Sequence, residues 1–192
     1  MDRIINLPEG YKAVSYLQAD GNQYFDSGYA FTDPELKIEF KYQKTDLSTN
    51  VFGVDTGSSG VSRFMHGHIY ANNFYVGSFG RTLDTELKQK VNTIYEVSVV
   101  ITGTTVEDQQ AVLILNGKSQ TFAATQSCIF PGTEVTDGVF STNSGRGPYQ
   151  YLLQGRIYYL RFYDEDGVLV RNFEPCVRTS DNKPGMYDTV HD

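Results

Sequence analysis

Apolar and polar residues alternate strictly along several short stretches of this chain. Residues 36–43, Leu-Lys-Ile-Glu-Phe-Lys-Tyr-Gln, place every second side chain on an apolar face, which is the period of a half-buried β-strand. Residues 95–101 begin with the same alternation. The apolar run 111–115 is followed by Asn116-Gly117 and then by residues 118–122. Because Asn-Gly between two such runs favours a two-residue turn, this stretch predicts a β-hairpin.

Shorter strand candidates, separated by Gly, Asn or Ser, fill much of the remaining chain. They are residues 23–29, 50–55, 63–70, 73–79 and 138–141. Helical periodicity is nearly absent. Roughly a dozen short strands with turn residues between them predict an all-β fold, a two-sheet antiparallel sandwich.

The last predicted hairpin contains a cluster of acidic residues. Residues 155–163 and 168–173 are its strands, and we expect Tyr158, Leu160 and Phe162 on one face of the first. The connection, Asp-Glu-Asp-Gly at 164–167, is similar to the start of a calcium loop. The next residues, Val-Leu-Val-Arg, carry no side-chain oxygen to complete such a site. We therefore expect a tight turn in which Gly167 adopts a positive φ, without a calcium site.

Composition and charge narrow the class of protein. The chain has 192 residues, 14 Tyr, 12 Phe and 18 Gly, and a formal net charge of -7. Many aromatic residues and glycines suit strands and turns, whereas the negative charge argues against nucleic acid as a partner.

No apolar run is long enough to span a membrane, and residues 1–8 lack the apolar core of a secretory signal. We expect Cys128 and Cys176 to be buried free thiols rather than a disulfide.

One domain accounts for the chain. We assign residues 1–10 to an N-terminal lead or attachment segment and residues 11–192 to the sandwich domain. Residues 3–7 of the lead, Arg-Ile-Ile-Asn-Leu, are largely apolar and lie outside the core pattern. They predict a contact with another protein or with a second copy of the chain, so we expect a homo-oligomer.

Two segments resemble a known group of domains. Leu-Pro-Glu-Gly-Tyr at 7–11 leads into residues 14–29, which contain Gly-Asn-Gln-Tyr-Phe-Asp-Ser-Gly. The end of the chain carries Gly-Arg-Ile-Tyr at 155–158, Leu-Val-Arg-Asn-Phe-Glu-Pro-Cys at 169–176 and Gly-Met-Tyr-Asp at 185–188. Both segments resemble concanavalin A-like, laminin-G-type jelly rolls, which occur in bacteriophage structural proteins and in bacterial surface proteins. That group usually continues past Gly-x-Tyr-Asp with a further strand, which we expect to be missing here.

The segment 63–75 is the richest mixture of aromatic, amide and basic side chains. Sugar sites combine a ring that stacks on the pyranose with planar donors for its hydroxyls, so this segment is the candidate glycan site. The candidate ligand-binding residues, including three from other segments, are Arg63, His66, His68, Tyr70, Asn72, Asn73, Tyr75, Arg81, Tyr149 and Tyr151. A second interpretation stays open, in which Phe64, Ile69 and Phe74 belong to the core and the others are ordinary loop residues.

Metal binding and catalysis have weaker support. His66 and His68 would share one face of a strand, but no third metal ligand can be named, so we expect no metal and no cofactor. Glucanases of this fold carry alternate carboxylates on one strand, Glu-x-Asp-x-x-Glu, to act as acid and base. This chain has no such motif: Glu35 and Glu39 flank a strand, and Glu165 and Asp166 lie in a turn. We expect no enzymatic activity.

The resemblance and the residues together give a functional hypothesis. We expect a non-enzymatic binding or assembly module, a bacteriophage virion structural protein such as a head-fibre, decoration or tail-tip component that displays a surface- or glycan-recognition domain. Its partners would be other virion proteins and a cell-surface glycan, with no nucleic acid and no membrane insertion. The alternative is a carbohydrate-binding domain of a bacterial cell-surface or secreted protein.

Overall fold

The computed structural model describes ten parts of the chain, namely residues 5–30, 35–46, 51–55, 63–66, 75–76, 80–81, 87–105, 107–123, 138–139 and 152–191. In the strands at 52–55, 63–66, 75–76, 80–81 and 138–139 only the backbone is described.

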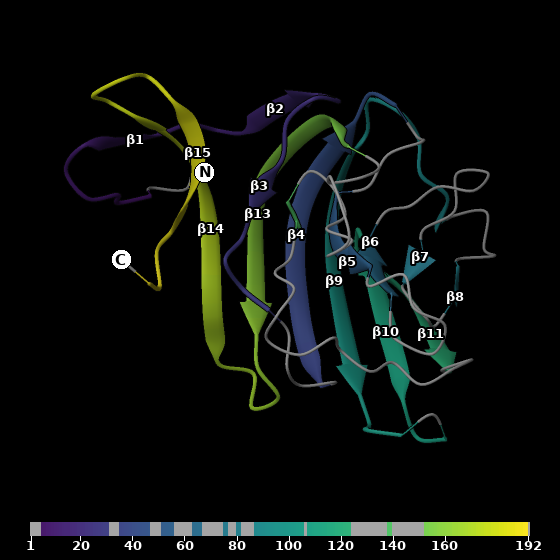
Figure 1. The fold of residues 1–192 in the computed structure, drawn as a ribbon. Helices are drawn as coiled ribbons and strands as arrows, with labels where there is room; N and C mark the ends of the chain where they lie inside the picture. Colours follow the sequence, from purple (N-terminus) through teal and green to yellow (C-terminus); the bar gives the residue numbers. More distant parts are fainter. Residues whose placement is uncertain are drawn as a thin grey trace.

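The described strands form two antiparallel sheets packed as a sandwich (Figure 1). The nine-stranded sheet runs in the order β1-β14-β13-β4-β9-β10-β11, with β15 beside β14 and β2 beside β13. Its strands are β1 (Tyr11–Ala13), β2 (Leu17–Asp20), β4 (Leu36–Lys44), β9 (Ile94–Thr102), β10 (Gln110–Leu115), β11 (Lys118–Ala123), β13 (Gln154–Tyr163), β14 (Leu169–Arg178) and β15 (Pro184–Asp188). The six-stranded sheet contains, in spatial order, β3 (Phe25–Asp26), β12 (Gly138–Val139), β5 (Phe52–Asp55), β6 (Arg63–His66), β7 (Tyr75–Val76) and β8 (Gly80–Arg81). The predicted all-β, two-sheet antiparallel sandwich is confirmed.

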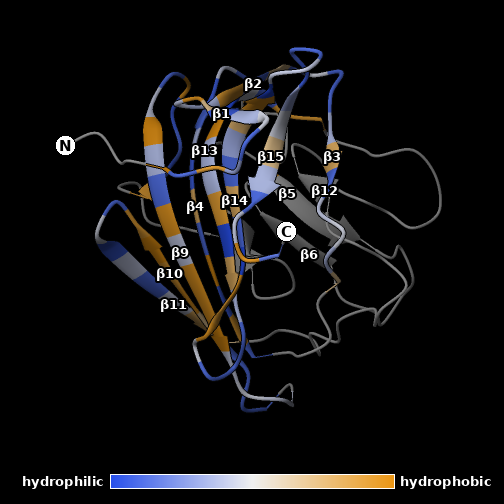
Figure 2. Ribbon diagram, turned by 90° about the vertical axis from the view of Figure 1, so that its left-hand side faces the viewer, coloured by the Kyte–Doolittle hydropathy of each residue, from blue (hydrophilic) through white to orange (hydrophobic). Residues whose placement is uncertain are grey.

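The core lies on the inner face of the nine-stranded sheet, the face turned toward the six-stranded sheet (Figure 2). In β4 every second residue is buried, from Leu36 to Lys44, and β9 and β10 bury alternate residues in the same way. The rings of Phe40 and Tyr42 stack at 5.5 Å. The apolar residues of the two-residue alternation therefore lie on the buried face of the sheet, and the polar residues lie on the outer face.

Most predicted strands form, with changes at their ends. The hairpin at Asn116-Gly117 is confirmed, with φ of 48° and 82° at the two turn residues, as a type I′ turn requires. The strand predicted at 23–29 is only two residues long. It ends there because Asp26 Oδ1 accepts a hydrogen bond from the Gly28 backbone N–H at 2.9 Å, which turns the chain. The return strand predicted at 168–173 continues to Arg178.

One prediction about β13 is wrong. Leu160 and Phe162 are buried in the core, but Tyr158 lies on the opposite, outer face, together with Tyr159. The register with β4 shifts at this point, because Ile157 faces Tyr42 and Tyr159 faces the next residue, Lys41. Tyr158 is thus the extra residue of a β-bulge, which reverses the inside–outside alternation.

Strands β13 and β14 pair along only part of their length. Leu160–Tyr163 pair with residues 169–173, and beyond that point the two strands separate. β1 then pairs with β14 and β2 pairs with β13, so the chain from β1 to β2 fills the opening between them. Val14 fixes this crossing by donating its N–H to Pro175 O at 3.0 Å. We call the opening the fork.

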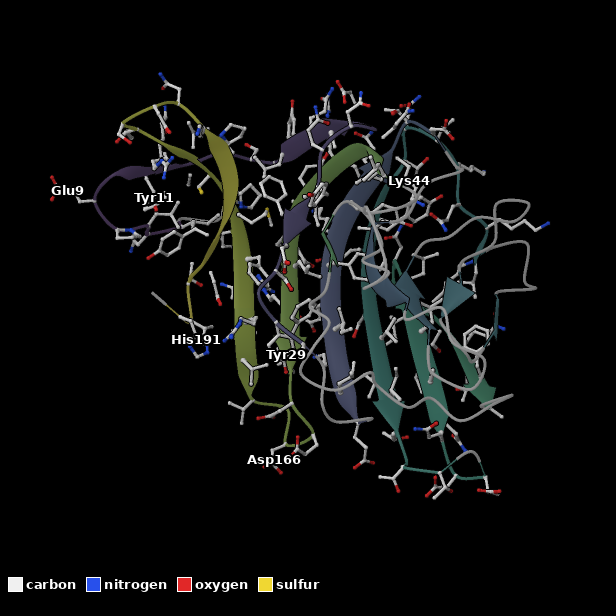
Figure 3. The ribbon with its side chains drawn as sticks, in the orientation of Figure 1. Glu9, Tyr11, Tyr29, Lys44, Asp166 and His191 are labelled. Atoms are coloured by element: carbon white, nitrogen blue, oxygen red, sulfur yellow. The ribbon has the colours of Figure 1, made fainter. Side chains whose placement is uncertain are left out.

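The acidic segment 164–167 is the turn between β13 and β14, as predicted, and Asp166 lies at the opposite end of the sheet from Lys44 (Figure 3). Asp164 Oδ1 accepts the Val168 N–H at 2.7 Å, and Gly167 has a φ of 76°. One of the three carboxylates is therefore part of the turn itself.

Cys176 is a buried free thiol, while Cys128 lies outside the described residues.

Candidate functional site

The site predicted from the sequence falls on the six-stranded sheet, mostly outside the described residues. The backbones of Arg63, His66, Tyr75 and Arg81 lie in the neighbouring strands β6, β7 and β8, with Tyr75 directly opposite Arg81. The side chains of these four are not described, and the remaining candidates lie outside the described residues altogether: His68, Tyr70, Asn72, Asn73, Tyr149 and Tyr151. This site stays a prediction.

A second candidate site lies on the outer face of the nine-stranded sheet, the face turned away from the core. Two adjacent cavities of about 550 and 330 Å³ share Glu96, Tyr159 and Arg161 in their walls. Together they form what we call the outer groove. The larger cavity is lined by Ile5, Ala13, Val14, Ser15, Lys41, Glu96, Tyr158, Tyr159, Arg161 and Glu174. The smaller is lined by Glu39, Glu96, Val97, Ser98, Ile114, Asn116, Gly117, Tyr159 and Arg161.

The register of three neighbouring strands places Tyr159, Lys41 and Glu96 in one row at the centre of the outer groove. Tyr159 stands opposite Lys41 in β4, and Lys41 stands opposite Glu96 in β9. The Tyr159 hydroxyl reaches across β4 and donates a hydrogen bond to Glu96 Oε1 at 2.8 Å. The bulge makes this row, because it places Tyr159 on the outer face while Leu160 stays in the core.

Arg161 is held in one orientation by four neighbours. Its guanidinium carbon lies 4.4 Å from the centre of the Tyr159 ring. Its Nε donates to Asn172 Oδ1 at 3.1 Å, and its terminal nitrogens lie 3.6 Å from Glu39 Oε2 and 3.9 Å from Glu174 Oε1. Since Asn172 and Glu174 are buried, this side of the arginine is fixed by the protein before any ligand arrives.

Aromatic rings and cations continue from the outer groove toward β2. Lys41 Nζ lies 5.8 Å from the centre of the Tyr158 ring, and the rings of Tyr158 and Tyr16 meet edge to face at a ring-centre distance of 5.7 Å. Arg156 in turn lies 4.3 Å from the centre of the Tyr16 ring. Such cation–ring pairs hold ring faces and charged groups side by side at the surface.

The neighbours of Glu39 and Tyr159 determine the protonation states of these two groups. Burial raises the pKa of Glu39, but hydrogen bonds from Lys37 and Tyr163 and the nearby Lys37 and Arg161 charges outweigh it, so the pKa of Glu39 lies below its ordinary value. Burial and the bond to Glu96 raise the pKa of Tyr159. At neutral pH Glu39 is therefore an anion and the Tyr159 hydroxyl is a donor. An ionised, ion-paired carboxylate is a poor general acid.

Metal and membrane sites have no support within the described ranges. No group of three or more His, Cys, Asp or Glu side chains is placed there to hold a metal ion. No helix among the same residues has the length and apolar character needed to cross a membrane.

Sequence reasoning missed the outer groove because its residues come from six separate segments of the chain. One local signal was present. The doublet Tyr158-Tyr159 interrupts the apolar–polar alternation of an otherwise regular strand pattern. An inserted bulge residue has this effect.

Comparisons with known proteins identify the fold. The chain matches no protein-family model and no curated protein sequence. Among solved structures, it is similar to a native heptameric SAP-like pentraxin from Limulus polyphemus, with a TM-score of 0.54 and 12% identity over 77% of this chain and 75% of that one. The similarity confirms a jelly-roll sandwich of the concanavalin A-like type. At this identity it shows the fold alone.

Proposed function

We propose that the chain is a non-enzymatic binding module that recognises a carbohydrate through the outer groove. The observation that carries the proposal is the centre of the groove, where the ring of Tyr159, the fixed guanidinium of Arg161 and the carboxylate of Glu96 border both cavities.

These groups match the two needs of sugar recognition. Tyr158 and Tyr159 supply ring surface against which the apolar face of a pyranose can stack. Arg161 and Glu96 supply planar donors and acceptors that can bind pairs of hydroxyls. Both cavities have the size of small-ligand sites, and adjacent cavities suit a chain of sugars better than a single ring.

The state of one groove carboxylate, Glu39, favours a binding role over catalysis. Glycoside hydrolysis needs one protonated and one ionised carboxyl on opposite sides of the scissile bond. Glu39 is kept ionised by Lys37, Tyr163 and Arg161, and the turn carboxylates at 164–166 lie beyond the described walls of the groove.

The biological setting we propose is a bacteriophage virion, in which the chain is a structural component such as a head-fibre, decoration or tail-tip protein. The sequence resemblance over roughly the first 30 and last 40 residues supports this setting. Residues 1–10 would attach the domain to other virion proteins or to further copies. Gly10 O accepts hydrogen bonds from Thr179 N at 2.9 Å and Thr179 Oγ1 at 3.2 Å, so the end of the lead is held to the domain, and Ile5 of the lead lies in the wall of the outer groove. The alternative setting is a bacterial cell-surface or secreted protein.

A glycan array with matched arginine variants tests the binding proposal. We expect the wild-type protein to bind a defined set of glycans, and Arg161→Gln to lose most of that signal. Arg178→Gln is the control, because Arg178 is exposed, pairs with Asp181 and lies outside the groove. An array without binding, or equal binding by both variants, would contradict the proposal. Detection of the chain in purified virions at a fixed stoichiometry would distinguish the two settings.

A further inference from the structure

The fork between β13 and β14 contains a pocket that the proposed function does not use. Its volume is about 460 Å³. Most of its wall is apolar, and the polar part comes from two glutamines, a serine and a tyrosine. The lining residues are Val14, Ser15, Tyr16, Leu17, Gln18, Gln23, Phe25, Val177 and Pro184. We call it the fork pocket.

The two glutamines have fixed carboxamides. Gln18 Oε1 accepts a hydrogen bond from Arg156 Nε at 3.1 Å, and Gln23 Oε1 accepts one from the Asp20 backbone N–H at 2.9 Å. Both partners can only donate, so the oxygen of each amide is identified by its bond. Neither NH₂ group has a hydrogen-bond partner among the described residues. Gln18 and Gln23 are both exposed, so the pocket wall has two NH₂ donors open to a ligand from the solvent side.

We infer that the fork pocket takes the acetamido group of an N-acetylated amino sugar. This inference rests on the proposed function and specifies its ligand. An acetamido group combines a methyl group, which the partly exposed side chains of Phe25 and Val177 can cover, with a carbonyl oxygen that accepts from a glutamine NH₂. A sugar hydroxyl at the same position has no apolar part, so it would leave this wall uncovered.

The fork pocket and the outer groove are neighbours. Val14 and Ser15, which cross the fork, line both. Tyr16 of the pocket also touches Tyr158 of the groove edge to face. One oligosaccharide can therefore place an acetamido group in the fork pocket while an adjacent sugar ring lies on Tyr158.

Two tetrasaccharides with the same linkage test the inference. One is the β-1,4-linked tetramer of N-acetylglucosamine and the other is the β-1,4-linked tetramer of glucose, which differs by lacking the acetamido groups. In calorimetric titrations we expect the acetylated tetramer to bind the wild-type protein about tenfold more tightly, the combined value of one buried methyl and one additional hydrogen bond.

Gln18→Glu and Gln23→Glu are the matching variants. Each keeps the acceptor oxygen that Arg156 or Asp20 uses, removes the NH₂ donor and adds one negative charge, so the local fold should persist, as a thermal melt can verify. We expect the variant of the glutamine that donates to the acetamido oxygen, one of these two, to reduce the preference for the acetylated tetramer to about threefold or less. Gln110→Glu, an exposed residue at the start of β10, adds the same charge elsewhere and should leave the preference unchanged.

The outcomes separate the two proposals. Equal affinity of the wild-type protein for both tetramers, or an unchanged preference in both glutamine variants, would overturn the acetamido assignment and leave glycan binding intact. Failure of both tetramers to bind, with a glycan array that shows other ligands, would also overturn it. A blank array would overturn the proposed function as well.

Discussion

Tyr159 and Glu96 lie 63 positions apart in the chain, and the Tyr159 hydroxyl donates a hydrogen bond to Glu96 Oε1 at 2.8 Å. The bond spans β4, which lies between their strands, and its two partners border both cavities of the outer groove. It joins a ring that can stack on a sugar to a carboxylate that can bind hydroxyls. The bond therefore fixes the relative position of the two groups that we propose to bind the ligand.

Removing only this hydroxyl should separate positioning from stacking. We expect Tyr159→Phe to lower the free energy of unfolding by at most about 1 kcal/mol, since one exposed hydrogen bond is lost. Glycan affinity should fall by only about threefold, because the ring remains and Glu96 is merely less fixed. Denaturant unfolding and calorimetry measure the two effects. A loss of binding as large as that of Tyr159→Ala would show that the hydroxyl, and not the ring, carries recognition.

The bulge at Tyr158 leads to a second prediction. Without Tyr158, Ile157, Tyr159 and Leu160 would alternate inward, outward and inward, so deletion of this residue restores regular pairing with β4. We expect the deletion variant to fold with a melting temperature close to wild type and to bind glycans more weakly. Deletion of Arg161 is the contrasting case, because it would turn the buried Phe162 outward. Similar thermal stability of the two deletion variants would contradict this account of the bulge.

The sequence predicts the long strands well and the site poorly, for one physical reason. Burial of alternate residues leaves a local signal, so the strands at 36–43 and 95–101 and the turn at Asn116-Gly117 were predictable. Which strand pairs with which leaves no comparable local signal in the sequence. The fork, where β1 and β2 separate two strands that are joined by a short turn, depends on contacts between the two ends of the chain. The outer groove depends on register across β13, β4 and β9 and on one inserted tyrosine.

Gly155 should be essential for the pairing of β13 with the end of β4, where it stands opposite Lys44. A Cβ atom at this position would lie 2.1 Å from the backbone oxygen of Gln43, and the backbone around it has little room to move. We expect Gly155→Ala to destabilise the protein by about 1–3 kcal/mol or more. Gly185→Ala is the control, since no atom lies within 4 Å of its Cβ position, and it should change stability by less than about 0.5 kcal/mol. Equal melting temperatures for the two variants would contradict the steric argument.

Lys44 gives a prediction about pH. It ends the inward-facing row of β4 (Figure 3), and burial lowers its pKa well below the ordinary value, although the Asp46 carboxylate opposes this. Between the folded pKa and the unfolded value of about 10.4, the unfolded chain binds more protons than the folded one, so this residue makes stability rise with pH. Lys44→Met removes that contribution. We expect the difference in melting temperature between Lys44→Met and wild type to shrink from pH 7 to pH 9.5. A difference that stays constant would show that Lys44 does not titrate in this way.

The most direct test of the account is a calorimetric titration of an array-selected glycan into the wild-type protein, Tyr159→Ala and Tyr24→Ala. Tyr24 is 48% exposed and lines neither cavity of the outer groove, so it controls for the loss of a surface tyrosine. If the outer groove is the binding site, Tyr159→Ala will weaken binding by about 1–3 kcal/mol, the value of a ring buried against a sugar, and Tyr24→Ala will bind like wild type. Unchanged affinity in Tyr159→Ala, with the protein folded, would contradict the assignment of glycan recognition to the outer groove.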